Sequence, residues 1–258
     1  MKIVVVGGTG LIGSKLVSRL MRAGEAVLAA SPRNGVDAFT GTRLTEALAG
    51  ADIVVDASNP PLVDGGSARD YFTRSTANLL EAGLEAGVRH HIALSIVGAD
   101  RAPADGYMVA KGAQEQLVLG SVLPHTVLRA TQFFEFAEQI ADWNTTQDTI
   151  RLPATRMRPV ASDDVVSALM GLVRSGPVEP VLELGGPEEV GLDEFVRRVL
   201  LLHHDPRYIL ADPAASPIGF NLQADVLLPA AGFRAADTTL AAWIDSRRVH
   251  ERVNARTR

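Results

Sequence analysis

The stretch IVVVGGTGLIG, Ile3–Gly13, decides the fold of this chain. Its four apolar residues predict a short buried strand, and the residues from Leu11 onward have the spacing of an amphipathic helix. Between the two lie glycines in a GxxGxxG arrangement, namely Gly7, Gly10 and Gly13. In such a unit the first glycine permits a tight turn, the second lets the backbone approach a pyrophosphate, and the third lets helix and strand pack closely. The stretch therefore predicts a dinucleotide-binding strand–turn–helix unit.

The helix that follows the turn is expected to meet the phosphates with its free backbone N–H groups. The expected contacts of this loop are Gly7, Thr9, Gly10, Leu11, Ile12 and Gly13. A plain strand-to-helix turn without a ligand is the alternative.

The end of the second predicted strand indicates which dinucleotide is bound. In NAD-specific folds an acidic residue about 20 residues after the glycines holds the ribose 2′-hydroxyl. Here the sequence AASPRNG (29–35) has no acid before Asp37, and Ser31 and Arg33 stand in its place. A hydroxyl donor and a fixed cation suit a 2′-phosphate, so we expect NADPH in preference to NADH. A surface arginine in a turn is the alternative.

Short apolar runs alternate with longer amphipathic segments, which is typical of parallel strands joined by helical crossovers. We expect strands at Ile3–Val6, Ala26–Ala30, Ile53–Asp56, His91–Ile96, Thr126–Leu128, Ile150–Leu152 and Val181–Leu184. We expect helices at Leu11–Ala23, Ala68–Ala86, Tyr107–Leu119, Phe133–Trp143, Asp163–Arg174 with Ser162 as N-cap, Leu192–Leu202 and Thr238–Ser246. The segment from Asp205 to the last helix is expected to be irregular, and the final ERVNARTR to be a frayed tail.

These elements predict an α/β fold, a doubly wound Rossmann-type parallel sheet with a small C-terminal substrate lobe. Residues 1–140, completed by residues 160–186, would form the dinucleotide-binding domain. Residues 141–159 and 187–258 would form the substrate-binding lobe.

Composition limits the classes of function. The chain has 258 residues, 47% of them hydrophobic, which is enough for a substantial core. A net charge of −5 argues against a general nucleic-acid or membrane-surface binder. The absence of cysteine excludes disulfides and thiolate metal sites and fits a reducing compartment. No apolar stretch has the length of a membrane span, so we expect a cytoplasmic protein without a metal. The oligomeric state is not indicated.

The segment GYMVAKGAQEQL, Gly106–Leu117, pairs two rare residues. The chain has 3 tyrosines, and its only lysines are Lys2, Lys15 and Lys111. Tyr107 and Lys111 are four residues apart, so on a helix they share a face. The ammonium would lower the pKa of the tyrosine hydroxyl and donate to ribose hydroxyls, which the planar guanidinium of arginine does less well. The pair predicts a proton-transfer site.

Four motifs, GGTGLIG, HHIALSIVG, YxxxK and LRATQFFEF, together resemble the short-chain dehydrogenase/reductase superfamily, and more narrowly its atypical NmrA-like NAD(P)H-binding branch. RPVASDDV, LELGGP and TTLAAWI extend the resemblance over nearly the whole chain. It implies that Tyr107 protonates a carbonyl oxygen while the nicotinamide delivers hydride, that Lys111 assists, and that Ser95 polarises the carbonyl. The superfamily's helix asparagine has no clear counterpart, since Asn78 follows its expected position by about a turn.

Ligands of open α/β sheets lie beyond the carboxyl ends of the strands. The strand ends therefore predict cofactor contacts from Ala57, Ser58, Asn59 and Thr131, with Gln132 as a further candidate. Val97, Phe133 and Phe134 are candidates for an apolar substrate pocket, with core packing as the alternative for the phenylalanines.

The favoured function is an NADPH-dependent oxidoreductase that reduces a ketone, quinone or activated enone with Tyr107 as proton donor. The partner would be a small apolar carbonyl- or quinone-type substrate. The alternative is a catalytically silent NADP(H)-binding redox sensor, because the same branch includes such regulators and also ether reductases that keep the lysine without the tyrosine.

Overall fold

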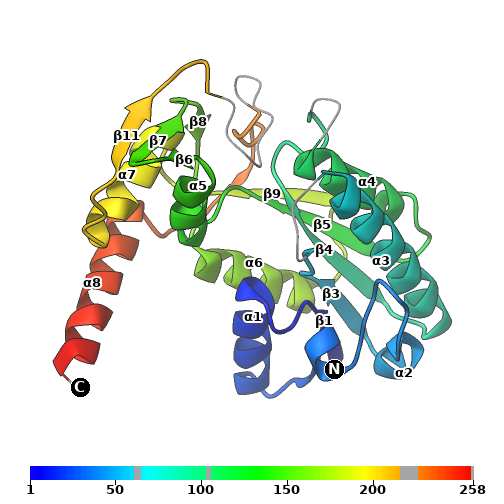
Figure 1. Cartoon of the computed structure of the whole chain (residues 1–258). Helices are drawn as coiled ribbons and strands as arrows, with labels where there is room; N and C mark the ends of the chain where they lie inside the picture. Colours follow the sequence, from blue (N-terminus) through cyan, green and yellow to red (C-terminus); the bar gives the residue numbers. More distant parts are fainter. Residues whose placement is uncertain (61–64, 103–105, 216–225, 257–258) are drawn as a thin grey trace.

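The computed structural model describes residues 1–60, 65–102, 106–215 and 226–256, and its centre is a seven-stranded sheet (Figure 1). The strand order is β12-β9-β5-β4-β3-β1-β2, and all neighbouring strands are parallel. The strands are β1 Lys2–Val6, β2 Ala26–Ala30, β3 Ile53–Asp56, β4 His90–Ile96, β5 His125–Ala130, β9 Val181–Gly185 and β12 Arg234–Ala235. The order 2-1-3-4-5 is one of the two common doubly wound arrangements, so the predicted fold class is confirmed.

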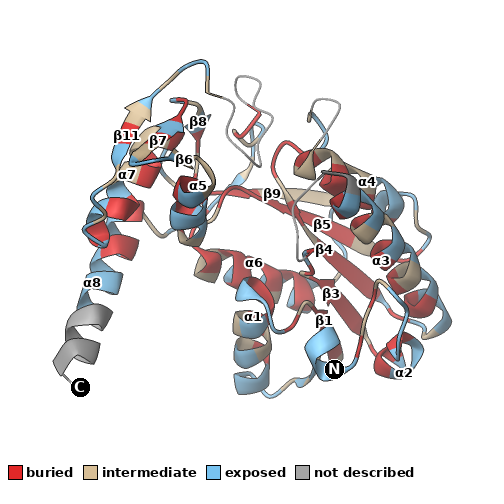
Figure 2. Cartoon of the chain, in the orientation of Figure 1, coloured by how far each residue is buried: buried red, intermediate tan, exposed pale blue. Residues whose placement is uncertain are grey.

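Helices cover both faces of this sheet. On one face lie α1 (Leu11–Arg22) and α6 (Ser162–Ser175), packed on Ile3 and Val5 of β1. On the other lie α2 (Leu44–Leu48), α3 (Gly65–Glu85) and α4 (Tyr107–Leu119). Because both faces are covered, the central strands β1, β3, β4 and β5 are almost continuously buried, whereas the outer helix faces are exposed (Figure 2). In the described ranges, no helix combines the length and the apolar character that crossing a membrane requires.

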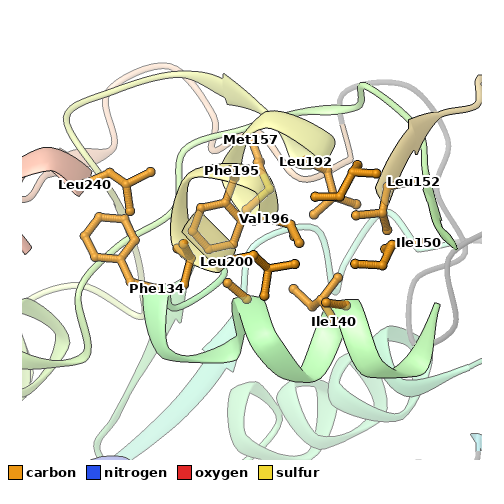
Figure 3. Packing of buried hydrophobic residues seen from close by; sticks show 14 of the residues in the cluster. Phe134, Ile140, Ile150, Leu152, Met157, Leu192, Phe195, Val196, Leu200 and Leu240 are labelled. Atoms are coloured by element: carbon orange, nitrogen blue, oxygen red, sulfur yellow. The ribbon is translucent and has the colours of Figure 1, made fainter. Parts of the chain in front are cut away.

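A second hydrophobic cluster lies beside the sheet and is shown in Figure 3. Phe134 and Phe195 are its largest fully buried side chains, and the ring of Trp243 lies 5.5 Å from that of Phe134. The cluster is built from α5 Ala137–Trp143, α7 Leu192–Leu202, α8 Leu240–Arg256 and the strands β7 Thr149–Leu152, β8 Arg156–Met157, β10 Val190–Gly191 and β11 Tyr208–Ala211. A further short strand, β6 Thr145–Thr146, pairs with β7. The predicted division of the chain into two domains stays a prediction.

Several predicted elements were wrong in detail. The helix predicted for Phe133–Trp143 is broken, because Phe133 keeps an extended backbone, pairs with Val160 and precedes a separate 3-10 turn, η2 (Phe134–Phe136). The segment expected to be irregular contains β11, and α8 continues to Arg256 through most of the tail that was expected to be frayed. Helix α2 was missed.

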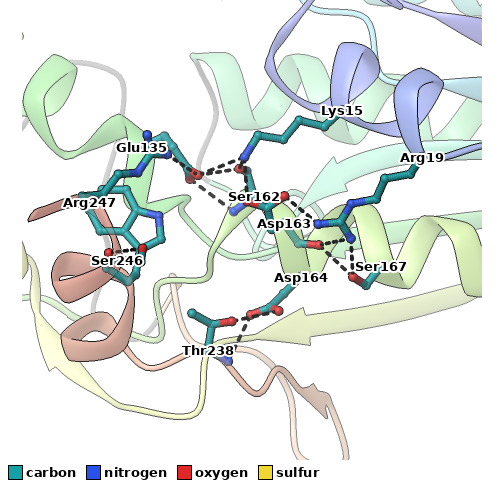
Figure 4. Close-up of polar contacts among 11 residues, drawn as sticks. Lys15, Arg19, Glu135, Ser162, Asp163, Asp164, Ser167, Thr238, Ser246 and Arg247 are labelled. Carbon is teal, nitrogen blue, oxygen red and sulfur yellow. Dashed lines mark hydrogen bonds and ion pairs between the residues drawn. The ribbon is translucent and has the colours of Figure 1, made fainter. Parts of the chain in front are cut away.

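Ser162 was predicted to cap α6, but Ala161 is the N-cap residue and no side chain caps the helix. The Ser162 hydroxyl instead donates to Glu135 Oε1 and accepts a hydrogen bond from Lys15 Nζ at 2.6 Å. Lys15 also binds Asp163 at 2.9 Å, as Figure 4 shows. The first turn of α6 therefore joins α1 to the turn that leads into the second cluster.

The same turn of α6 also holds the approach to α8. Asp164 accepts hydrogen bonds from the backbone N–H and the hydroxyl of Thr238, at 3.2 and 3.0 Å (Figure 4). Arg19 of α1 reaches Asp163 at 2.7 Å, and Arg247 of α8 lies 3.7 Å from Glu135. We call the polar contacts of Lys15, Arg19, Glu135, Ser162, Asp163, Asp164, Thr238 and Arg247 the α6 junction.

Two adjacent histidines of β4 are buried in the sheet. His91 has no accessible surface, and neither of its ring nitrogens has a hydrogen-bond partner. The His90 ring contacts the Thr126 hydroxyl at 3.0 Å. The pKa of each ring is lowered to about 4, chiefly by burial and, for His90, also by the neighbouring His91. Both rings are therefore neutral in the folded chain at neutral pH.

The lowered pKa values of His90 and His91 predict a loss of stability in mild acid. The pKa of each ring is about 4 in the folded chain against the ordinary 6.5, so the unfolded chain binds protons first as the pH falls. As far as these two rings are concerned, the free energy of unfolding is at its full value above pH 6.5 and falls progressively toward pH 4. His91→Leu should remove about half of this pH dependence, since one of two similar rings is lost.

Urea unfolding between pH 7 and pH 4.5 measures the effect. His204→Asn replaces an exposed histidine with a positive φ by a residue that tolerates that conformation, and it should leave the slope unchanged. An unchanged slope in His91→Leu would contradict the assignment.

Candidate cofactor and active site

The glycine turn after β1 lies where the strand order reverses, with β2 on one side of β1 and β3 on the other. Gly7 has a φ of +74°, and a Cβ atom there would lie 2.6 Å from the carbonyl oxygen of Ala57. A Cβ atom on Gly13 would lie 2.2 Å from the carbonyl oxygen of Gly7. Only glycine fits at both positions, so the turn, the start of α1 and the residues after β3 are in close contact.

The start of α1 is suited to an anion. Its N-cap residue, Gly10, provides no side-chain hydrogen bond, and its first turn holds no acidic residue. Leu11 and Thr9 are exposed at this end of the helix. The first-turn N–H groups thus face no competing carboxylate, which fits a pyrophosphate at the switch point of the sheet.

Residues after β2 occupy the expected ribose side of the turn. Ser31 is buried, and its hydroxyl has no hydrogen-bond partner. Arg33 is exposed in the 3-10 turn η1 (Pro32–Asn34). Asp37, the first acid in this stretch, accepts a hydrogen bond from the Phe39 N–H at 2.9 Å. An unpartnered hydroxyl two residues before an exposed arginine fits a phosphate oxygen, and Asp37, the first acid along the chain after β2, is engaged in its own turn.

Tyr107 and Lys111 lie on α4, but they bond to other residues rather than to each other. The Tyr107 hydroxyl donates to Asn59 Oδ1 at 2.7 Å. Lys111 is buried, and its Nζ donates to the carbonyl oxygen of Leu94 at 2.7 Å and to Gln114 Oε1. The ammonium was expected to act on the hydroxyl of Tyr107, but the hydrogen bonds of Lys111 are directed at Leu94 and Gln114 instead.

The predicted lowering of the tyrosine pKa is wrong for this arrangement. Burial raises the pKa of Tyr107, so the phenol is protonated at neutral pH and can act as a proton donor. Burial lowers the pKa of Lys111 to about 8, against the opposing influence of Asp56 and Glu115. Because Lys111 faces Gln114 and Leu94, its charge is not directed at the phenol.

Ser95 lies near the end of β4 and is buried, with a hydroxyl that has no hydrogen-bond partner. Ser95 pairs in register with Arg129 of β5, whose guanidinium binds Glu115 of α4 at 2.6 Å. Paired residues of a parallel sheet point to the same face, so Ser95 lies on the face that α4 covers. Asn78 donates to the carbonyl oxygens of Ala38 and Phe39, which makes it a structural residue of α3.

The remaining candidates differ in exposure. Ser58 is buried and its N–H donates to Asp56 Oδ1 at 3.0 Å, whereas Asn59 is exposed. Thr131 is buried and its hydroxyl donates to the carbonyl oxygen of Arg158. Neither polar atom of the buried Gln132 side chain has a hydrogen-bond partner.

The predicted substrate-pocket residues are largely core residues. Val97 has no accessible surface, and Phe134 belongs to the second hydrophobic cluster. Phe133 is half-buried and its ring stacks on that of the exposed Phe136, with centroids 5.4 Å apart. Of the three, Phe133 alone is more than 1% exposed in this structure.

Residues 7–174 match the profile of a family described as NAD(P)H-binding. The chain belongs to this NAD(P)H-binding family. The predicted NAD(P)H-binding family is thereby confirmed, whereas the narrower resemblance to the NmrA-like branch of the short-chain dehydrogenase/reductase superfamily stays a prediction. A curated relative, the photosystem II assembly factor Ycf39 of Synechocystis, is 27% identical over 172 residues, which cover 58% of this chain and 53% of that protein. The match thus spans about half the length of the relative.

Solved structures share the fold over nearly the whole chain. MoeE5 in complex with UDP-glucose and NAD gives a TM-score of 0.76 at 20% identity, covering 99% of this chain and 100% of its own. A short-chain dehydrogenase/reductase superfamily protein from Agrobacterium tumefaciens with bound NAD gives 0.71 at 15%, covering 99% and 98%. dTDP-4-dehydrorhamnose reductase from Bacillus anthracis, in complex with NADP, gives 0.72 at 13%, covering 95% and 96%. At these identities the likeness shows the fold.

Three residues that the sequence analysis missed contact the site of this NAD(P)H-binding chain. Gln114 bonds to Lys111 and to Asp56, and the Phe72 ring lies 4.3 Å from Lys111 Nζ. Asp56 ends a predicted buried strand, and a carboxylate at that position was a signal that could have been used. Gln114 and Phe72 carried no such signal, because either residue on a helix face is ordinarily explained by packing.

The tight packing of the glycine turn predicts a selective effect of added methyl groups. Gly13→Ala should lower the free energy of unfolding by about 1–3 kcal/mol and weaken cofactor binding, because its Cβ meets backbone atoms that cannot move independently. Gly171→Ala in α6, where a Cβ meets nothing within 4 Å, should raise it by about 0.5–1 kcal/mol. Denaturant unfolding of both variants measures the difference. Equal effects would show that the close approach at Gly13 is not required.

Proposed function

We propose that this NAD(P)H-binding chain is an NADPH-dependent reductase of a ketone, quinone or activated enone, with Tyr107 as proton donor. One observation carries the proposal. Tyr107 bonds to Asn59, and Lys111 bonds through Gln114 to Asp56, so both engage the end of β3 and the segment that follows it. The backbone of that segment touches Gly7, so the acid, the cation and the dinucleotide turn share one end of the sheet.

The residues have distinct roles in this proposal. Bound NADPH would supply the hydride that reduces the substrate carbon. Tyr107 holds a proton on its hydroxyl oxygen and transfers it to the substrate oxygen once that oxygen replaces Asn59 Oδ1 as its acceptor. Ser95 supplies a hydroxyl that is buried without a partner and can donate to the same oxygen. Lys111 holds the ribose, and the lobe of residues 141–159 and 187–258, with Phe133 at its edge, holds an apolar substrate.

The cofactor preference provides one test. If Ser31 and Arg33 bind a 2′-phosphate, NADPH should bind at least about tenfold more tightly than NADH, equivalent to ~1.4 kcal/mol. Arg33→Ala should remove most of this preference, whereas Arg248→Ala, at an exposed arginine of α8, should not. Fluorescence titration with both cofactors measures the ratio. Equal affinities in the unmodified chain would rule out the 2′-phosphate site.

The proton donor provides a second test. Tyr107→Phe should reduce turnover by ~10²-fold or more, the scale of a positioned proton donor, with little change in NADPH affinity. Lys111→Ala should reduce both turnover and affinity, and Lys111→Arg should restore them poorly because the guanidinium does not fit the same bonds. Tyr208→Phe, at an exposed tyrosine of β11, is the matched control. NADPH oxidation against a panel of quinones, ketones and enones measures the rates; an unchanged rate in Tyr107→Phe contradicts the assignment.

The second candidate function is a catalytically silent NADP(H)-binding protein that acts through a partner. Its support is the match to Ycf39, whose name describes an assembly factor. Under this function NADPH binds tightly, no compound of the panel is reduced, and Tyr107→Phe changes nothing but the contact to Asn59. Pull-down with and without NADPH distinguishes the two, because a sensor should bind its partner differently in the two conditions.

A further inference from the structure

The ammonium of Lys111 is held by neutral groups. Its Nζ donates to the carbonyl oxygen of Leu94 and to the amide oxygen of Gln114, and it lies 4.3 Å from the centre of the Phe72 ring. The residue is 3% exposed, so water does not replace these partners. A buried ammonium that lacks a directly bonded carboxylate is unusual, since burying an unpaired charge is costly.

Gln114 connects this ammonium to a carboxylate. Its Oε1 accepts from Lys111, and its Nε2 donates to Asp56 Oδ2 at 2.8 Å. Gln114 and Asp56 are each 1% exposed. The reverse orientation of the amide would set two donors against each other at Lys111 and two acceptors at Asp56. The amide is therefore fixed by opposite charges at its two ends.

The other titratable groups near Lys111 do not bond to it. Glu115 lies one residue further along α4, but Arg129 of β5 binds its carboxylate at 2.6 Å. From β4 the buried ring of His91 interacts electrostatically with Asp56, and burial keeps that ring neutral by lowering its pKa to about 4. Tyr107 contacts the Phe72 ring and donates to Asn59. Of the described residues around Lys111, Gln114 is the one that links the ammonium to a carboxylate, that of Asp56, by hydrogen bonds.

We propose that Gln114 is a positioning residue for Lys111: its amide transmits the charge of Asp56 to the ammonium and holds it at the Leu94 carbonyl, one helical turn from Tyr107. The significance for catalysis rests on the reductase function proposed above. A direct ion pair with Asp56 would draw the ammonium toward β3, and the amide prevents this by standing between them. Gln114 thus keeps Lys111 charged and fixed at the Leu94 carbonyl.

The rarity of lysine makes the proposal directly measurable. Labelling with [13Cε]lysine should give three NMR signals, from Lys2, Lys15 and Lys111, and a pH titration of the unliganded chain follows each one. Lys111, whose pKa burial lowers to about 8, should titrate there in the unmodified chain. In Gln114→Leu the charged form loses its acceptor and the leucine fills the same space, so the midpoint should fall by at least about one pH unit.

Gln114→Glu is the conservative replacement. Whether its carboxyl group ionises or shares a proton with Asp56, one oxygen still faces Lys111, so the midpoint should return to the original value or above. Gln116→Leu, an exposed position of the same helix, should leave the midpoint unchanged. If Gln114→Leu does not fold, Asp56→Asn removes the charge at the other end of the amide, and the Lys111 midpoint should fall again. A midpoint that is the same in Gln114→Leu or Asp56→Asn as in the original chain overturns the proposal.

The same variants separate this proposal from the reductase function. If both hold, the pH profile of kcat in Gln114→Leu moves with the Lys111 midpoint, and KM for the substrate changes little. A shifted midpoint in a chain that neither binds NADPH nor reduces any substrate supports the role of Gln114 and contradicts the reductase. Turnover that depends on Tyr107 together with an unshifted midpoint supports the reductase and contradicts the role of Gln114.

Discussion

The contact between Gly13 and the carbonyl oxygen of Gly7 is the constraint on which the rest of the structure depends. No side chain fits between them, so α1 begins directly against the end of β1. Because Gly7 also has no side chain, the backbone of Ala57 and Ser58 after β3 approaches it closely. Asp56 at the end of β3 and Asn59 after it in turn receive hydrogen bonds from Gln114 and Tyr107 of α4. The position of the candidate active site thus depends on the close packing at Gly7 and Gly13.

Helix α4 and the second hydrophobic cluster are each fixed by charged groups at partly or fully buried positions. Arg129 of β5 binds Glu115 of α4, Asp100 after β4 and Glu183 of β9, so it holds α4 against three neighbouring segments. At the opposite face, the α6 junction joins α1 to the second cluster. A guanidinium suits the first role because its planar fork serves several carboxylates together. The small ammonium of Lys15 suits the second, since it must reach a hydroxyl and a carboxylate on one helical turn.

What could be predicted from the sequence was what local patterns determine. The strand, turn and helix of residues 3–13 follow from apolar spacing and glycine placement, and Tyr107–Leu119 was predicted with the observed bounds. Ser162 was misassigned because its partners, Lys15 and Glu135, lie 147 and 27 residues away. The Lys111 ammonium was expected to lie near the Tyr107 hydroxyl and lower its pKa, because helical spacing brings the two residues to one face. Partners from elsewhere in the fold determine the hydrogen bonds instead: Tyr107 bonds to Asn59, and Lys111 bonds to Gln114 and Leu94. Such partners leave no periodic signal in a single sequence.

The short strand β12 returns from the second cluster to pair with β9 at the margin of the main sheet. Without β12, the N–H and C=O groups of β9 at this margin would be an open edge, which other chains can extend by strand addition. The C-terminal region therefore covers the end of β9 at Leu184 and Gly185 as well as contributing to the second cluster. Natural or engineered exchange of that region between relatives would have to conserve a two-residue strand, whatever else it changed.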